Sequence, residues 1–182
     1  MRVEMFMVRA AVFAMACAGI VLSGAQGQQE VAGWQVNCDE GPIPDAGEGC
    51  FLTKAASNSD TASLIVVMTD FFDEARGQLW LGVSDVAAFG TAGLSTIALD
   101  DESYEIPAAT NAHGDYSGDA PTSYTVVDFR LTPDFVSRLR DGVTFSFSVT
   151  LAEPEMIVEG EVSLDGLREA WSTAAESQGW TP

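Results

Sequence analysis

Residues 34–54, WQVNCDEGPIPDAGEGCFLTK, contain two short strand-like pieces that flank a loop rich in Gly, Pro, Asp and Glu. The first piece, 34–38, alternates large apolar with polar residues, which is the period of a half-buried strand. The second piece, 50–56, resumes strand character after a loop whose two prolines prevent regular pairing. We therefore expect an antiparallel hairpin that brings Cys38 and Cys50 close together.

The first 25 residues have the features of a secretion signal. Two arginines supply a basic start, an apolar run follows over residues 10–22, and small residues precede a cleavage point after Ala25. The run is shorter than the about 20 apolar residues that span a bilayer. An uncleaved anchor and lipid attachment at Cys17 are the alternatives. We expect cleavage after Ala25, no transmembrane segment in the remainder, and one domain over 26–182.

The composition is strongly acidic. Lys and Arg together number 8, Asp and Glu together number 27, and the formal net charge is −19 at pH 7. Phosphate contacts need clustered Lys and Arg, so this balance excludes nucleic acid and anionic membrane surfaces as default partners. The acids are scattered, which favours solubility or adaptation to a salty medium as their purpose. Calcium or a basic partner is the alternative.

Two cysteines follow the signal, Cys38 and Cys50. In an exported protein an even number of cysteines indicates a disulfide. A metal-binding pair would need further ligands, yet no other cysteine remains and His113 is the only histidine. Closing a loop of about a dozen residues contributes roughly 3 kcal/mol in the chain-entropy model. We predict a Cys38–Cys50 disulfide, and neither a metal nor a cofactor.

Most of the remaining chain has the pattern of short strands. Residues 62–69 are β-branched and almost all apolar, which predicts a central strand buried on both faces. Residues 143–151 alternate apolar side chains with hydroxyls, and residues 156–163 are their expected pairing strand. Residues 108–122 are small and polar, and we expect an exposed loop there. Further strands are expected at 78–84, 94–99 and 124–131.

Two helices are expected, both late in the chain. The first begins at Thr132, an N-cap hydroxyl followed by proline and an acid, and ends at Gly142. The second carries an apolar stripe from Leu164 to Ala174. Many short strands with turn signals, and no alternation of strands with helices, predict an all-β antiparallel β-sandwich. One short helix precedes its last hairpin, and a helix closes the chain.

The order of the motifs carries a resemblance. A W-x-V-x-C strand opens at Trp34 and a CFLTK strand follows at Cys50. A short helix ends in Arg-Asp-Gly at 140–142, a hairpin follows, and LDGLREAW occupies 164–171. In these features the chain resembles the invasion-associated locus B family of exported bacterial proteins. The resemblance covers most of the mature chain and is carried by its two ends.

The resemblance implies an immunoglobulin-like sandwich in the periplasm or at the outer membrane, and no catalytic mechanism. In pathogens the family is linked with host-cell entry. Two departures are that Leu167 stands where an aromatic residue is usual, and that residues 55–182 lack the second cysteine pair that members often carry. We expect a periplasmic or secreted, non-enzymatic protein that binds another envelope or host protein. The alternatives are a periplasmic hydrolase using acidic residues, and a structural or stress-protective envelope protein without a specific ligand.

One polar cluster contains residue types that occur in calcium sites and in hydrolase triads. Asp115, Ser117 and Asp119 place oxygen ligands at alternate positions, as calcium loops do, but the full loop pattern with a distal glutamate is missing. Together with His113 they supply the residue types of a hydrolase triad, yet no G-x-S-x-G elbow is present. We interpret the cluster as a solvated loop, keep calcium as the alternative, and assign no catalytic residue.

Aromatic residues suggest where the core and a partner surface lie. Phe71 and Phe72 are adjacent within a polar turn and point in different directions, so one of them is a candidate for a partner surface. The alternative is that both tuck under the sheet. Trp34, Trp80 and Trp171 each lie on a periodic apolar face, and we expect them in the core.

Overall fold

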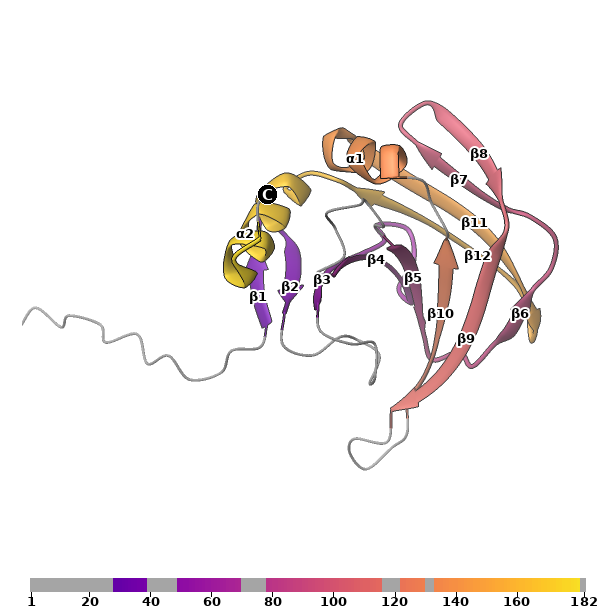
Figure 1. Ribbon diagram of the computed structural model, residues 1–182. Coiled ribbons are helices and arrows are strands. Elements are labelled where there is room, and N and C mark those ends of the chain that lie inside the picture. Colours follow the sequence, from indigo (N-terminus) through magenta and orange to yellow (C-terminus); the bar gives the residue numbers. More distant parts are fainter. Residues whose placement is uncertain (1–27, 39–48, 70–77, 116–121, 130–132, 181–182) are drawn as a thin grey trace, which may run out of the picture.

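The computed structural model describes residues 28–38, 49–69, 78–115, 122–129 and 133–180. Within them the chain forms twelve strands and two helices, and the strands make two antiparallel sheets (Figure 1). The predicted all-β sandwich is therefore confirmed. The expected secretion signal, with its cleavage point at Ala25, lies outside the described residues.

The larger sheet has seven strands in the order β1-β2-β3-β4-β5-β10-β9. They are β1 (Gln28–Val31), β2 (Trp34–Asn37), β3 (Gly49–Ala55), β4 (Ala62–Thr69), β5 (Gln78–Ser84), β9 (Ala108–Asp115) and β10 (Thr122–Phe129). The first five strands are neighbours in chain order. In immunoglobulin domains the second and third strands lie in opposite sheets, so the immunoglobulin-like part of the prediction is not confirmed.

The smaller sheet has the order β12-β11-β7-β8, and β6 pairs with the far end of β11. These strands are β6 (Phe89–Thr91), β7 (Ser95–Leu99), β8 (Glu102–Ile106), β11 (Thr144–Glu153) and β12 (Glu155–Ser163). The alternation predicted for 143–151 is confirmed in β11. Phe145, Phe147, Val149 and Leu151 are buried, whereas the hydroxyl residues between them are half-buried on the other side.

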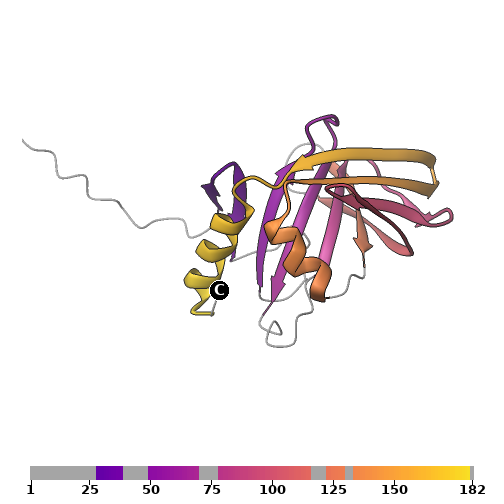
Figure 2. The same ribbon diagram turned by 90° about the horizontal axis from the view of Figure 1, so that it is seen from above.

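Two helices close the sandwich. Helix α1 (Pro133–Asp141) contributes Phe135 and Leu139 to the core, and Phe135 meets the Tyr104 ring of β8 edge to face. Helix α2 (Leu167–Gln178) lies beside β1 and β2 (Figures 1 and 2) and buries the predicted apolar stripe, including Leu167 and Trp171. Neither helix has the length and apolar composition that crossing a membrane requires, within the described part of the chain.

Residues 108–122 are not the continuous exposed loop that their composition predicts. Residues 108–115 form β9, which pairs with β10 from Ala108 opposite Phe129 to Asp115 opposite Thr122. Small and polar side chains have low intrinsic strand preference, but pairing with a neighbouring strand overrides that preference. The prediction was wrong because the pairing partner is visible only in three dimensions.

The free edge of β12 is closed at one point by the turn between β3 and β4. The Ser57 amide donates to the carbonyl of Glu161 at 2.8 Å, and the Glu161 amide donates to Asn58 Oδ1 at 2.7 Å. Ser57 and Asn58 of this turn thus supply the hydrogen bonds that a further strand would otherwise make at Glu161. The turn also joins the larger sheet to the edge of the smaller one.

Both faces of the larger sheet carry apolar side chains. Its inner face shares one core with the smaller sheet and the helices, and Trp34 and Trp171 belong to that core as predicted. Its outer face carries a second cluster of buried residues, Phe51, Ile65, Val67, Trp80 and Val126. This arrangement confirms that 62–69 is buried on both faces, and Trp80 is buried as predicted.

Gly160 of β12 lies opposite Phe147, and an added Cβ would meet the Phe147 ring at 2.0 Å. We expect Gly160→Ala to lower the free energy of unfolding by about 1–3 kcal/mol, because overpacking forces the ring out of its position. Urea denaturation measures this change. Phe147→Leu in the Gly160→Ala background should recover part of the loss. If the loss of stability in the double variant equals the sum of the losses in the two single variants, the packing argument is contradicted.

Candidate functional site

The outward side chains of the smaller sheet form a regular surface. On β11 they are the hydroxyl residues Thr144, Ser146, Ser148 and Thr150. The strand register aligns these with neighbours on both sides. Ser148 lies between Thr96 of β7 and Glu159 of β12, and Ser146 lies between Ala98 and Glu161. We call the outward surface of β7, β8, β11 and β12 the hydroxyl face.

The hydroxyl face is acidic at its borders. Glu159 and Glu161 are exposed on β12, and Glu105 is exposed on β8, where it lies opposite Thr96. Ser148 Oγ donates to Glu159 Oε1 at 3.1 Å. The five strands of this sheet contain six glutamates and neither Lys, Arg nor His. The small central side chains are thus bordered by carboxylates without a basic neighbour in the sheet.

An exposed aliphatic side chain belongs to the same surface. Ile157 on β12 is 65% exposed and lies opposite Thr150. A second, Leu94, is 59% exposed and directly precedes β7, where the pairing with β11 changes register between Thr96 opposite Ser148 and Ala92 bonded to Thr150. Exposed large apolar side chains on an otherwise polar surface mark interaction sites. Hydroxyls, carboxylates and an exposed aliphatic residue make this surface suited to binding a macromolecule.

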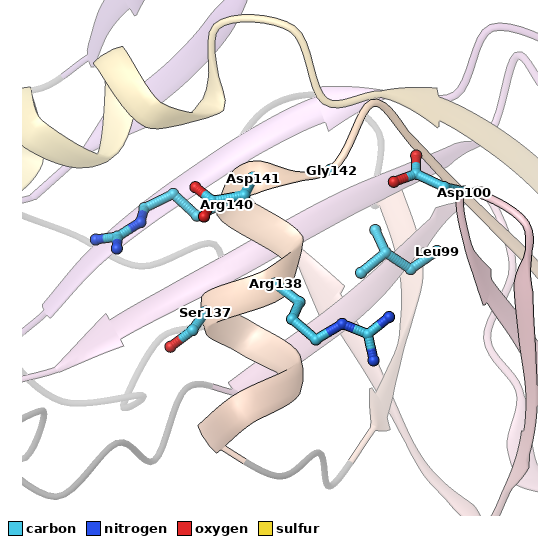
Figure 3. A pocket seen from close by; sticks show the side chains of 7 residues that line it. All are labelled: Leu99, Asp100, Ser137, Arg138, Arg140, Asp141 and Gly142. Atoms are coloured by element: carbon cyan, nitrogen blue, oxygen red, sulfur yellow. The ribbon is translucent and has the colours of Figure 1, made fainter.

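A pocket at the end of α1 is the second candidate. It is a cavity of about 330 Å³ lined by Leu99, Asp100, Ser137, Arg138, Arg140, Asp141 and Gly142 (Figure 3). Figure 3 shows Arg138 extending from α1 toward Leu99, whereas Arg140 extends to the other side of the helix. The pocket holds charges of both signs, so their partners decide whether it can bind a ligand.

Arg138 is held by residues of β8. Its guanidinium makes an ion pair with Glu102 at 2.7 Å and donates to the Tyr104 hydroxyl at 2.9 Å, and Tyr104 in turn donates to Glu102. The hydrogen bond from Tyr104, followed by that from Arg138, lowers the pKa of the Glu102 carboxyl. The bond to Glu102 raises the pKa of Arg138. This network joins α1 to β8.

The other charged groups of the pocket also have partners within the chain. Asp100 Oδ1 accepts from the backbone amides of Val143 and Thr144, both at 2.9 Å, and these bonds lower the pKa of Asp100. Asp141 pairs with Arg168 of α2 at 2.6 Å, and Arg140 lies over the Trp171 ring. The charged groups of the pocket thus hold α1 against β8 and α2, and we call this region the structural joint. The hydroxyl face is therefore the stronger candidate for a binding site.

The residues quoted for the family resemblance meet in space. Trp34 Nε1 and Lys54 Nζ both donate to the backbone carbonyl of Asp165, at 3.0 and 2.9 Å. The Lys54 ammonium also lies over the Trp34 ring, 5.3 Å from its centroid. Burial lowers the pKa of Lys54, and the Asp165 carboxylate opposes that shift. The opening hairpin and the turn before α2 thus form one unit.

The predicted disulfide joins Cys38 to Cys50 and is confirmed. It lies under α2. Cys50 is fully buried with its sulfur 3.7 Å from the Ala174 carbonyl, and Ser177 donates to the sulfur of Cys38. The disulfide therefore fixes the surface on which the C-terminal helix packs. The residues around the disulfide therefore serve the packing of this helix.

The other predicted sites fall on residues that the structure does not describe. Phe71, Phe72, Ser117 and Asp119 lie outside the described residues, and Asp115 ends β9 with its side chain likewise outside the description. Among the described residues, no three His, Cys, Asp or Glu side chains lie close enough to hold a metal ion. The partner surface at 71–72 and the calcium site stay predictions.

Sequence reasoning missed the hydroxyl face as a site, although part of its signal was present. The alternation over 143–151 was used only to predict a strand, and the exposed positions of 155–163 follow the same period. Comparison of the chain with family models, with curated proteins and with solved structures found no match.

Trp34 and Trp80 provide a matched test of the contact with Asp165. Both are buried, but Trp80 Nε1 has no hydrogen-bond partner among the described residues. Trp34→Phe should lower the free energy of unfolding by about 0.5–1.5 kcal/mol more than Trp80→Phe, because it removes one of the two hydrogen bonds to the Asp165 carbonyl while Lys54 keeps the other. Chemical denaturation measures both variants. Equal losses would contradict a stabilising role for the Trp34 hydrogen bond.

Asp100 should make the stability of the joint depend on pH. Its pKa is lower in the folded than in the unfolded chain, so its stabilising effect is present above the unfolded value, about 3.9, and is lost as pH falls through the folded value. Asp100→Asn should therefore differ most from wild type above about pH 5, and the difference should shrink on acidification. Urea unfolding at several pH values measures this trend.

Asp100→Ala separates the charge of Asp100 from its capping bonds. This variant loses the acceptor for the Val143 and Thr144 amides, so it should be less stable than Asp100→Asn at every pH. If the difference in stability between wild type and Asp100→Asn were constant with pH, the assignment of the pH dependence to this carboxylate would be contradicted.

Proposed function

We propose that this chain is an exported, non-enzymatic protein of the bacterial cell envelope that acts by binding another protein. The observation that carries the proposal is the hydroxyl face, where Ile157 is exposed beside a row of small hydroxyl side chains and Leu94 is exposed directly before β7. Such a surface offers hydrogen bonds and apolar area on one sheet, which suits association with a macromolecule.

Three further features support the proposal. The Cys38–Cys50 disulfide is of the kind that persists in oxidising compartments, which fits a periplasmic or secreted protein or one associated with the outer membrane. The first 25 residues have the pattern of a cleaved secretion signal. The motifs at both ends of the chain resemble the invasion-associated locus B family, whose members are exported. The partner we expect is another envelope protein or a host protein.

The test compares three forms of the chain as bait for envelope and host-cell extracts. Wild type and Phe89→Ser should recover the same partner reproducibly, because Phe89 is as exposed as Ile157 but lies on β6, opposite Glu153 and away from the hydroxyl face. The double variant Leu94→Ser/Ile157→Ser should lose that partner, since it removes the apolar contacts. Mass spectrometry with quantitation measures the recovery.

Each result bears on the proposal. Loss of the partner with the double variant alone supports binding through the hydroxyl face. Equal recovery by all three forms would place the binding surface elsewhere, and no reproducible partner for wild type would contradict a protein-binding function. Circular dichroism of the variants checks that they are folded, which is expected because all three positions are exposed.

A further inference from the structure

The carboxylates of the hydroxyl face repeat along β12 with the period of an extended chain. Glu155, Ile157, Glu159, Glu161 and Ser163 are the exposed alternate residues of this strand, and the first four include its three carboxylates. Alternate residues of an extended chain are about 6.6–7 Å apart. A partner segment in the same conformation therefore presents its own alternate side chains at the spacing of these four.

A second carboxylate borders the face from the other side. Glu105 of β8 lies in one row with Thr96, Ser148 and Glu159, so three strand spacings separate the two glutamates. Neighbouring strands are about 4.8 Å apart, which makes this separation roughly 14 Å. The side chains between them are small. The result is a strip of hydroxyls bordered by carboxylates, wide enough for one extended segment with its side chains.

No basic group within the five described strands neutralises these carboxylates. Glu102 of the same sheet is paired, but it lies opposite the buried Leu99 on the inner side and is bound by Arg138. The outward glutamates differ from it, since neither ion pair among the described residues involves them. Complementary charge in a partner would increase its rate of association and determine its register.

We propose that the hydroxyl face binds an extended protein segment that carries Lys or Arg at alternate positions. This inference rests on the proposed function and names the chemistry of the partner. The basic side chains meet Glu155, Glu159 and Glu161, an aliphatic residue packs on Ile157, and the hydroxyls of β11 bond to polar groups of the segment.

The probe is a synthetic heptapeptide in which lysine, leucine, lysine and lysine alternate with threonine, which matches the order Glu155, Ile157, Glu159 and Glu161. A second peptide has the same composition with its three lysines contiguous. Fluorescence anisotropy with the full chain, its disulfide intact, measures the dissociation constants of both. The alternating peptide should bind more tightly, and equal affinity for the two peptides would overturn the proposed spacing.

Two triple variants test the location of the site at equal net charge. Glu155→Gln/Glu159→Gln/Glu161→Gln should weaken binding of the alternating peptide by about tenfold, as three exposed charge pairs of ordinary strength predict. The control triple variant replaces three glutamates that are exposed on β1 and α2, namely Glu30, Glu169 and Glu176. The control should keep nearly the wild-type affinity. Equal weakening by both would assign the attraction to overall charge and overturn the proposal.

The same variants separate this inference from the proposed function. If Leu94→Ser/Ile157→Ser loses the extract partner but the Glu155, Glu159 and Glu161 triple variant retains it, the proposed function stands and a basic partner is excluded. If the triple variant also loses the partner, and the control triple retains it, the inference is supported. Retention of the partner by every variant would overturn the inference and place the binding surface elsewhere.

Discussion

The backbone carbonyl of Asp165 holds the opening hairpin and the C-terminal helix together. It accepts hydrogen bonds from Trp34 and Lys54, which are 131 and 111 residues away in the sequence. Gly166 follows with a φ of 82°, and an added Cβ there would lie 2.5 Å from the Ala32 carbonyl oxygen. A side chain at Gly166 would therefore collide with Ala32, and this close approach fixes the position of the turn. Helix α2 starts from this turn and covers the disulfide. The closing of the core at this end depends on that contact.

The hydroxyl face depends on the same core from the opposite side. The apolar side chains of β11 and β12 that face the interior fix the twist and register of the strand pair, and Phe147 fills the space beside Gly160 that a Cβ would need. Because successive side chains alternate between faces, fixing the inner residues also fixes the outer row. Hydroxyls and carboxylates are thereby held in rows by the core, with a hydrogen bond from Ser148 to Glu159 between two of them. A rigid surface of this kind loses little entropy when a partner binds.

Much of the fold was predictable because its signals are local. The strand alternation in β11, the apolar stripe of α2 and the pairing of Cys38 with Cys50 all follow from period or residue count. Strand β9 was not predictable, since its small polar residues become a strand only through pairing with β10. The Asp165 contact uses a backbone acceptor, which carries no side-chain signal. The outward glutamates of β12 follow the strand period, but their relation to Glu105 requires the strand order.

The turn at Ser57 and Asn58 has a consequence for how copies of this protein behave at high concentration. An uncovered sheet edge offers amides and carbonyls to any strand that approaches, and identical chains can then join edge to edge into aggregates. Here both backbone groups of Glu161 are already occupied by that turn. An approaching strand cannot pair continuously along β12 without displacing part of the molecule's own framework. The acidic surface adds mutual repulsion between copies, so the chain can display an open sheet face without stacking on itself.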